Sequence, residues 1–263
     1  MSAQMIFAAE EFEPPTVSDF WQPLVGGGDS AFALTRPIVV LALTVVLISV
    51  VLLRVSRHLS VVPGRAQYLT EGLYGFVRNG IARDVLGSKD FLTFLPMLFT
   101  MFTLILVNNL LGVVPFVQFP TFSRIGFPIA LTLVVYLTYH GIGIRRHGLA
   151  GYVKSWVPPG LPPWIVPFIF VLEAITYLVT RPLTLALRLF ANMFAGHLLL
   201  LVFILGGEFM LIDGGIGLKL VSIGSFGLGF IMTVFEILVE FLQAYIFTLL
   251  AALYIAGALA DEH

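Results

Sequence analysis

The chain has 263 residues, of which 59% are hydrophobic and only 11% are charged, and its formal net charge is −1. Its mean hydropathy is +1.00. In an ordinary water-soluble protein roughly a quarter of the residues are charged, and this chain cannot supply such a surface. The composition therefore excludes a soluble enzyme or binding domain and predicts an all-α integral membrane protein. Because cysteine is absent, disulfides and thiolate metal sites are excluded as well.

Residues 1–36 contain five acidic side chains, and they have neither a basic start nor a sustained apolar run. A cleaved secretory signal is therefore not expected. We expect this segment to be an extracytoplasmic tail, and residues 37–263 to form a single membrane domain.

Gaps between charged residues define the membrane spans, because about 20 apolar residues in a helix cross a hydrocarbon core of ~30 Å. The gaps predict five crossings, at about 37–56, 91–114, 125–144, 164–206 and 220–260. Between the first two, residues 63–86 begin at a proline and place apolar side chains on one face at helical spacing. We expect them to form an amphipathic helix on the cytoplasmic membrane surface.

The last two spans are too long to cross upright. Residues 220–260 contain no proline, and one helix of that length would measure about 60 Å, twice the hydrocarbon thickness. The run 164–206 has the same excess length. We therefore expect two strongly tilted helices, joined by a loop at residues 206–219, that form an oblique antiparallel hairpin.

Basic residues predict the orientation, because they are enriched in cytoplasmic loops. The loops after the first and third spans hold most of them, namely Arg54, Arg57, Arg65, Arg78, Arg83, Lys89, Arg145, Arg146 and Lys154. The alternate loops hold only Arg124 and Lys219. The N-terminus is therefore expected outside and the C-terminus in the cytoplasm.

Arg188 lies in the middle of the fourth predicted span. An arginine at bilayer depth costs at least ~2.5 kcal/mol and cannot escape by losing its proton. It needs a carboxylate or water, so two alternatives are open: an internal ion pair with Glu173, Glu236 or Glu240, or a partner on another chain. Arg181 is easier to explain, because its side chain can extend toward the membrane interface.

The last span carries Glu236, Glu240 and Gln243, spaced i, i+4 and i+7, so that all three project to one stripe of the helix. Two carboxylates one turn apart at low dielectric cannot both ionise cheaply, so at least one can take up and release a proton. This spacing indicates a proton relay. The alternative is a structural pair of protonated acids that bond to neighbouring helices.

His197 lies nine residues after Arg188, on the opposite face of the same helix, whereas Asn192 shares the face of Arg188. A lone buried histidine is usually structural, but two glutamates on the adjacent helix favour a relay. Glu173 lies earlier on the helix, at a different depth. Acids at two depths with a permanent cation between them indicate two separate aqueous wells rather than one open pore.

Two blocks, LRLFANMFAGHLL around Arg188 and FEILVEFLQAYIFTLLAALY near the end, resemble subunit a of the rotary F-type ATP synthase. The segments PGRAQYLTEGLYGFV, NNLLGVVPF and YHGIGIRRHG match in order, so the resemblance runs from about residue 60 to the C-terminus. It implies a stator that carries protons to the carboxylates of a rotating ring of c subunits, in a complex with peripheral-stalk b subunits. It implies no cofactor, and no site for ATP hydrolysis on this chain.

The resemblance also assigns roles to single residues. Arg188 matches an arginine that faces the ring and blocks a leak between the inward and outward half-channels. His197 and Glu236 match the relay of the outward half-channel.

Asn192 and Gln243 match polar positions that line the channels. Glu173 resembles the acid of the inward half-channel, although it lies one residue farther from Arg188 than is common in the family. Glu240 takes no role from the resemblance, and its proposed function depends on its spacing alone.

Two rival functions remain open. In a proton-coupled secondary transporter, Arg188 would bind an anionic substrate while Glu236 and Glu240 couple to protons; such proteins usually have repeat-related halves, and no internal repeat is visible. In a structural assembly subunit, the charged groups would pair internally. The sequence contains no phosphate-binding glycine loop, metal-ligand cluster or nucleic-acid-binding patch. We expect a bacterial plasma membrane, with the proton as coupling ion.

Overall fold

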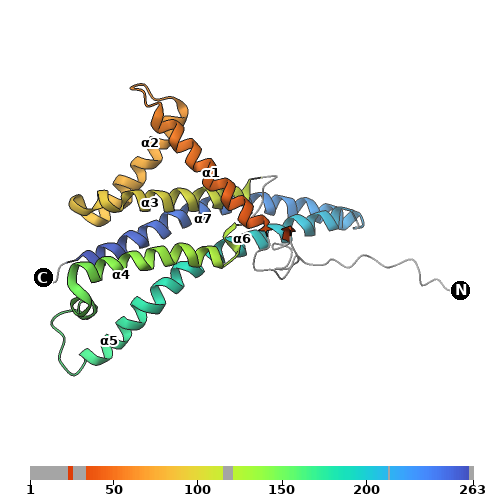
Figure 1. The fold of residues 1–263 in the computed structure, drawn as a ribbon. Coiled ribbons are helices and arrows are strands. Elements are labelled where there is room, and N and C mark those ends of the chain that lie inside the picture. Colours follow the sequence, from red (N-terminus) through yellow and green to blue (C-terminus); the bar gives the residue numbers. More distant parts are fainter. Residues whose placement is uncertain (1–22, 26–33, 115–120, 213, 261–263) are drawn as a thin grey trace.

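The computed structural model describes residues 23–25, 34–114, 121–212 and 214–260. Most of the expected tail at residues 1–36, and the last three residues, lie outside these ranges. The described chain is almost entirely helical (Figure 1). The exception is a short antiparallel pair, β1 (Pro23–Val25) with β2 (Leu34–Thr35).

The helices follow one another with few connecting residues. In chain order they are α1 (Arg36–Arg57), α2 (Arg65–Val77), the π-helical η2 (Arg78–Arg83), α3 (Asp84–Val113), the 3₁₀ turn η3 (Thr121–Ser123), α4 (Gly126–Lys154), α5 (Val166–Ile175), the π-helical η4 (Thr176–Thr180), α6 (Arg181–Ile212) and α7 (Ile216–Leu259). Five continuous runs among them are long and apolar enough to cross a membrane: Pro37–Arg57, Arg65–Val113, Gly126–Lys154, Val166–Ile212 and Ile216–Leu259. The all-α membrane fold expected from composition is confirmed.

Two glycines interrupt long helices near predicted boundaries. Gly87 lies between the expected amphipathic helix and the second span, and Gly148 lies shortly after the third span. Gly87 has φ +75° and Gly148 has φ +71°, and an L-residue with a side chain is strained in this region. Residues 65–86, which comprise α2, η2 and the first residues of α3, therefore form a separate helix. It is set at an angle to the part of α3 that follows Gly87 (Figure 1). Its bounds agree with the amphipathic helix expected at 63–86, and its position on a membrane surface stays a prediction.

The last two helices form an antiparallel hairpin that projects beyond the others (Figure 1). α7 is continuous over 44 residues, about 66 Å at 1.5 Å per residue. The expected loop at residues 206–219 is wrong, because α6 continues to Ile212 and α7 already begins at Ile216. Leucine, isoleucine and phenylalanine near these ends extend both helices, so the turn is short.

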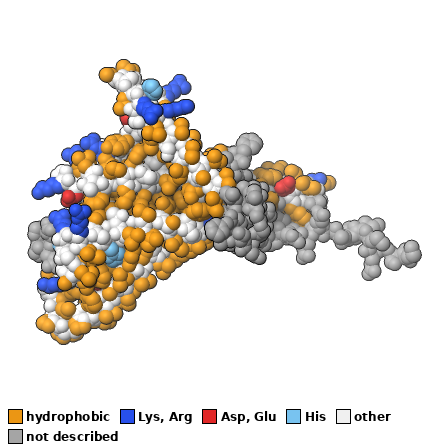
Figure 2. Space-filling model, viewed as in Figure 1, with side chains coloured by type: hydrophobic (Ala, Val, Ile, Leu, Met, Phe, Trp, Pro, Cys, Tyr) orange, Lys and Arg blue, Asp and Glu red, His pale blue; other side chains and the backbone are white. Residues whose placement is uncertain are grey.

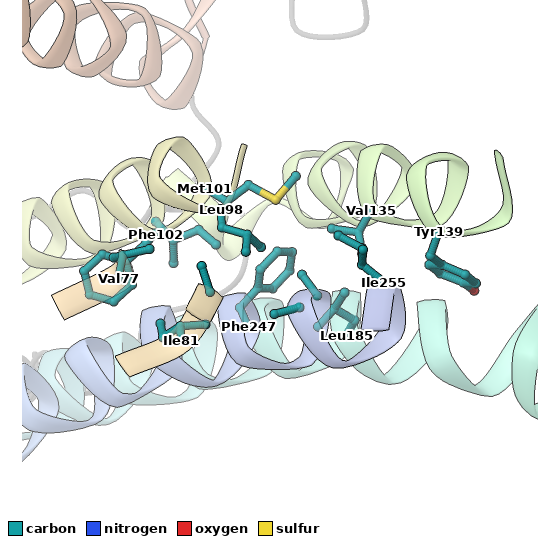
Figure 3. Packing of buried hydrophobic residues seen from close by; sticks show 14 of the residues in the cluster. Val77, Ile81, Leu98, Met101, Phe102, Val135, Tyr139, Leu185, Phe247 and Ile255 are labelled. Carbon is teal, nitrogen blue, oxygen red and sulfur yellow. The ribbon is translucent and has the colours of Figure 1, made fainter. Parts of the chain in front are cut away.

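The core lies between α3, α4, α6 and α7, with η2 closing one end (Figure 3). Phe102, Phe247 and Ile255 are fully buried there, and the small side chains of Ala244 and Ala251 allow neighbouring helices to approach α7 closely. Lipid is as apolar as leucine, so close packing rather than removal from water selects this core.

The outer surface is apolar as well. Figure 2 shows hydrophobic side chains over most of the visible face, with lysine and arginine gathered at one end and at the apex between α1 and α2. α1 is mostly exposed along its length. That both basic loops face the cytoplasm stays a prediction.

Candidate functional site

α6 presents two chemically different faces. Arg188 and Asn192 are exposed, whereas Leu189, Met193 and His197 are buried against the other helices. This is the division that the helical period predicts for Arg188 and His197.

Arg188 makes no ion pair or hydrogen bond with any residue that the structure describes. The internal ion pair with Glu173, Glu236 or Glu240 is therefore not formed. An arginine in the middle of an apolar span needs a counter-ion or water. Its exposed position leaves it open to a partner outside this chain.

Glu236, Glu240 and Gln243 of α7 are buried at the interface with α6 and α3. The exposed fractions of Glu236, Glu240 and Gln243 are 6%, 4% and 3%. The amide of Asn192 donates a hydrogen bond of 2.8 Å to the Gln243 Oε1 atom, and His197 Nδ1 lies 4.0 Å from Glu236 Oε1. The fold thus brings together His197 and Glu236, which were predicted as relay residues, and Asn192 and Gln243, which were predicted as polar lining.

A cavity of about 270 Å³ lies beside these residues. Its lining is mostly apolar, and the polar side chains in it come from three helices: Asn109, Asn192, Glu236, Glu240 and Gln243. The carboxyl oxygens of both glutamates are buried and have no hydrogen-bond partner among the described residues. Water is a usual partner of such buried polar groups. Arg188 does not line it.

Asn109 of α3 is a site residue that the sequence reasoning missed. Its amide donates to the Glu240 carbonyl oxygen at 3.2 Å, and its side chain lines the same cavity while being only 2% exposed. The available signal was the pair Asn108 and Asn109 inside an otherwise apolar span. A contact between positions 131 residues apart cannot be read from spacing.

Glu173 stands apart from this cluster. It lies half-buried on α5, before η4, and it does not line the cavity. Along the continuous run of α5, η4 and α6, Arg188 lies between Glu173 and His197. Within the described ranges, no group of three His, Asp or Glu side chains has the arrangement of a metal site.

Five apolar helical runs with an ionisable cluster in their interior define a polytopic membrane protein of the ion-handling class. The family model of the ATP synthase A chain matches residues 38–256, and the chain belongs to this family.

Individual relatives agree with the family match over nearly their whole length. The ATP synthase subunit a of a Nocardioides species is 44% identical, over 96% of this chain and 95% of the relative. The proteins of that name from Pseudarthrobacter chlorophenolicus and an Arthrobacter species are 41% and 40% identical, each over 96% of both chains.

Proposed function

We propose that this chain is the stator subunit of an F-type ATP synthase and supplies two proton half-channels to the carboxylates of a rotating c-ring. The carrying observation is that Arg188 is exposed on α6 without a partner among the described residues. A permanent cation that faces outward within a membrane needs water or a counter-ion in trans. A ring carboxylate would supply that counter-ion anew at each step of rotation.

The cavity beside Glu236 and Glu240 is the proposed outward half-channel. Water in it would connect the glutamates, and His197 would exchange a proton with Glu236 after a small approach from 4.0 Å. Asn109, Asn192 and Gln243 provide polar lining. The proton would pass from this well to the ring.

Arg188 separates this well from the proposed inward half-channel at Glu173. Because arginine does not release its proton, it cannot relay one directly between the two wells. A leak past it would lose ~2.3 kcal/mol per charge for each 100 mV of membrane potential. Protons are therefore required to travel with the ring.

The chain would work as the proton-translocating part of the complex, with ATP bound and hydrolysed on other subunits. The proposed partners are the c-ring, the peripheral-stalk b subunits and membrane lipid. The proposed location is the bacterial plasma membrane, with the N-terminus outside and the C-terminus in the cytoplasm.

Both rival functions are less well supported. A transporter with an arginine anion site would place Arg188 in a central cavity, but Arg188 is exposed and does not line the cavity that holds Glu236 and Glu240. A structural subunit would pair its charged groups internally, and Arg188 has no such partner among the described residues.

The test is ATP-driven acidification of inverted membrane vesicles that contain the assembled complex. We expect Arg188→Ala to abolish pumping while the complex stays intact, because the ring carboxylate loses its counter-ion and the barrier between the wells is lost. Leu187→Ala is the matched control, since Leu187 is a neighbouring exposed side chain at 39% and has no charge. Normal pumping by an assembled Arg188→Ala complex would contradict the proposal.

A further inference from the structure

A second polar cluster lies outside the relay site, where α4, η4, α6 and α7 meet. The Arg181 guanidinium carbon is 3.5 Å from the ring centroid of Tyr177 and 5.0 Å from that of Tyr254. Tyr139 of α4 reaches the same place and is 1% exposed. Figure 3 shows Tyr139 at the edge of the core beside Ile255. The proposed proton path uses none of these residues.

One backbone carbonyl of η4, that of Tyr177, receives no hydrogen bond in the usual helical pattern. The Arg181 N–H bonds to the Thr176 carbonyl, five residues back, and so it is not available to Tyr177 in the α-helical pattern. The next candidate, five residues after Tyr177, is Pro182, which has no N–H. The Tyr177 carbonyl therefore lacks the donors that α- and π-helical spacing would supply.

The Tyr139 side chain supplies a donor, and the ring of the neighbouring His140 faces the same backbone group. The Tyr139 hydroxyl donates a hydrogen bond of 2.8 Å to the Tyr177 carbonyl oxygen. An unpaired carbonyl is costly inside a membrane, where no bulk water replaces the lost bond. Because the donor comes from α4, this bond also ties the π-helical turn to a neighbouring helix.

The π-helical turn separates two residues of the proposed proton path. Glu173 precedes it on α5 and Arg188 follows it on α6. A π-helix has more residues per turn than an α-helix, so its presence changes the angle between the side chains on its two sides. Arg181, stacked on Tyr177 of the turn and close to Tyr254 of α7, fixes the start of α6.

We propose that Tyr139 is a positioning residue, which holds the π-helical turn at 176–180 and thereby sets the direction of Glu173 relative to Arg188. The expected effect on pumping rests on the proposed function. The dependence of the π-helical turn on the Tyr139 hydroxyl is independent of that function.

The first measurement compares pumping by assembled complexes that carry Tyr139→Phe, which removes only the hydroxyl. We expect the pumping rate to fall about threefold to tenfold, the equivalent of one typical hydrogen bond. No passive proton leak is expected, because Arg188 is unchanged. Tyr136→Phe is the matched control on the same helix, since the Tyr136 hydroxyl makes no hydrogen bond with the described residues.

A double-mutant cycle identifies the acceptor. Pro182→Ala introduces an N–H five residues after Tyr177, which can bond to the Tyr177 carbonyl in the π-helical pattern. In that background Tyr139→Phe should have little further effect on pumping. An equal loss in both backgrounds, or no loss from Tyr139→Phe alone, would overturn the proposal.

A distance measurement separates this proposal from the proposed function. The chain has no cysteine, so spin labels can be attached to cysteines introduced at Phe168 of α5 and Leu253 of α7, which are 63% and 47% exposed. Tyr139→Phe should shift or broaden the distance between the labels in the assembled complex, and Pro182→Ala should reverse the change. An unchanged distance would overturn the proposal even if Arg188 proves essential for pumping.

Discussion

The close approach of Glu236 to α6 depends on a residue without a side chain. A Cβ atom at Gly196 would lie 2.7 Å from Glu236 Oε1 and 3.2 Å from its Cδ atom. The atoms that would clash belong to the end of a flexible side chain, so the fold can adjust by moving the carboxyl group. Gly196 therefore controls where this carboxyl sits beside His197.

We expect Gly196→Ala to leave assembly intact and to lower ATP-driven pumping about tenfold, the equivalent of ~1.4 kcal/mol in the barrier. The physical reason is displacement of the Glu236 carboxyl from its place beside His197 and the cavity. Gly227→Ala on α7 is the control, because an added Cβ there meets nothing within 4 Å. Pumping by Gly196→Ala at the wild-type rate would show that this carboxyl position is not critical.

The sequence predicted some site contacts and missed others for a physical reason. Helical periodicity alone places Arg188 and His197 on opposite faces, and the structure confirms it. The bond from Asn109 to the Glu240 carbonyl joins separate helices, and no periodic pattern encodes it. Single-helix geometry was predictable, whereas pairing between helices required the packed fold.

At the level of elements, the helix breaks and the π-helical turn differ in how well the sequence indicates them. The amphipathic helix expected from apolar residues at helical spacing ends at residue 86, next to the break at Gly87. The π-helical η4 was not predicted, although Glu173 lies one residue farther from Arg188 than is common in the family. A π-helical turn can add one residue without interrupting the helix. Its donor, Tyr139, lies on another helix and leaves no local signal.

The break at Gly87 gives a stability prediction. Gly87→Ala should destabilise the fold by about 1–2 kcal/mol, because alanine is strained at φ +75°. Gly72→Ala in α2 should be neutral or stabilising, since an added Cβ there meets nothing within 4 Å and alanine favours a helix. Thermal release of the subunit from the assembled complex measures both. Equal midpoints for the two variants would contradict the assigned backbone conformation at Gly87.

At the scale of the whole molecule, composition determined the class of fold because the bilayer limits the choices. Lipid requires every backbone group to be bonded internally, so long apolar runs become helices. Each of the five predicted spans overlaps one of the five long helical runs, with at most two of its residues outside that run. The short turn between α6 and α7 was not predicted, because the glycines at 206, 207, 214 and 215 are typical of a loop. In the structure, the apolar residues between these glycines continue α6 to Ile212. Glycine is only a weak helix breaker when neighbouring helices pack against it.

The orientation of the whole molecule supplies the last prediction. Val61, between α1 and α2, is 102% exposed, and Ile216, at the start of α7, is 84% exposed. Three of the five long helical runs connect these positions, so they should face opposite sides of the membrane. The basic residues around Val61 predict that it faces the cytoplasm.

In the naturally cysteine-free chain, a membrane-impermeant maleimide should therefore label Ile216→Cys in intact cells and Val61→Cys only in inverted vesicles. The unsubstituted chain controls for background labelling. Labelling of both positions from one side would mean that one of the three connecting runs does not cross, and the stator arrangement with Arg188 between two wells would then lose its basis.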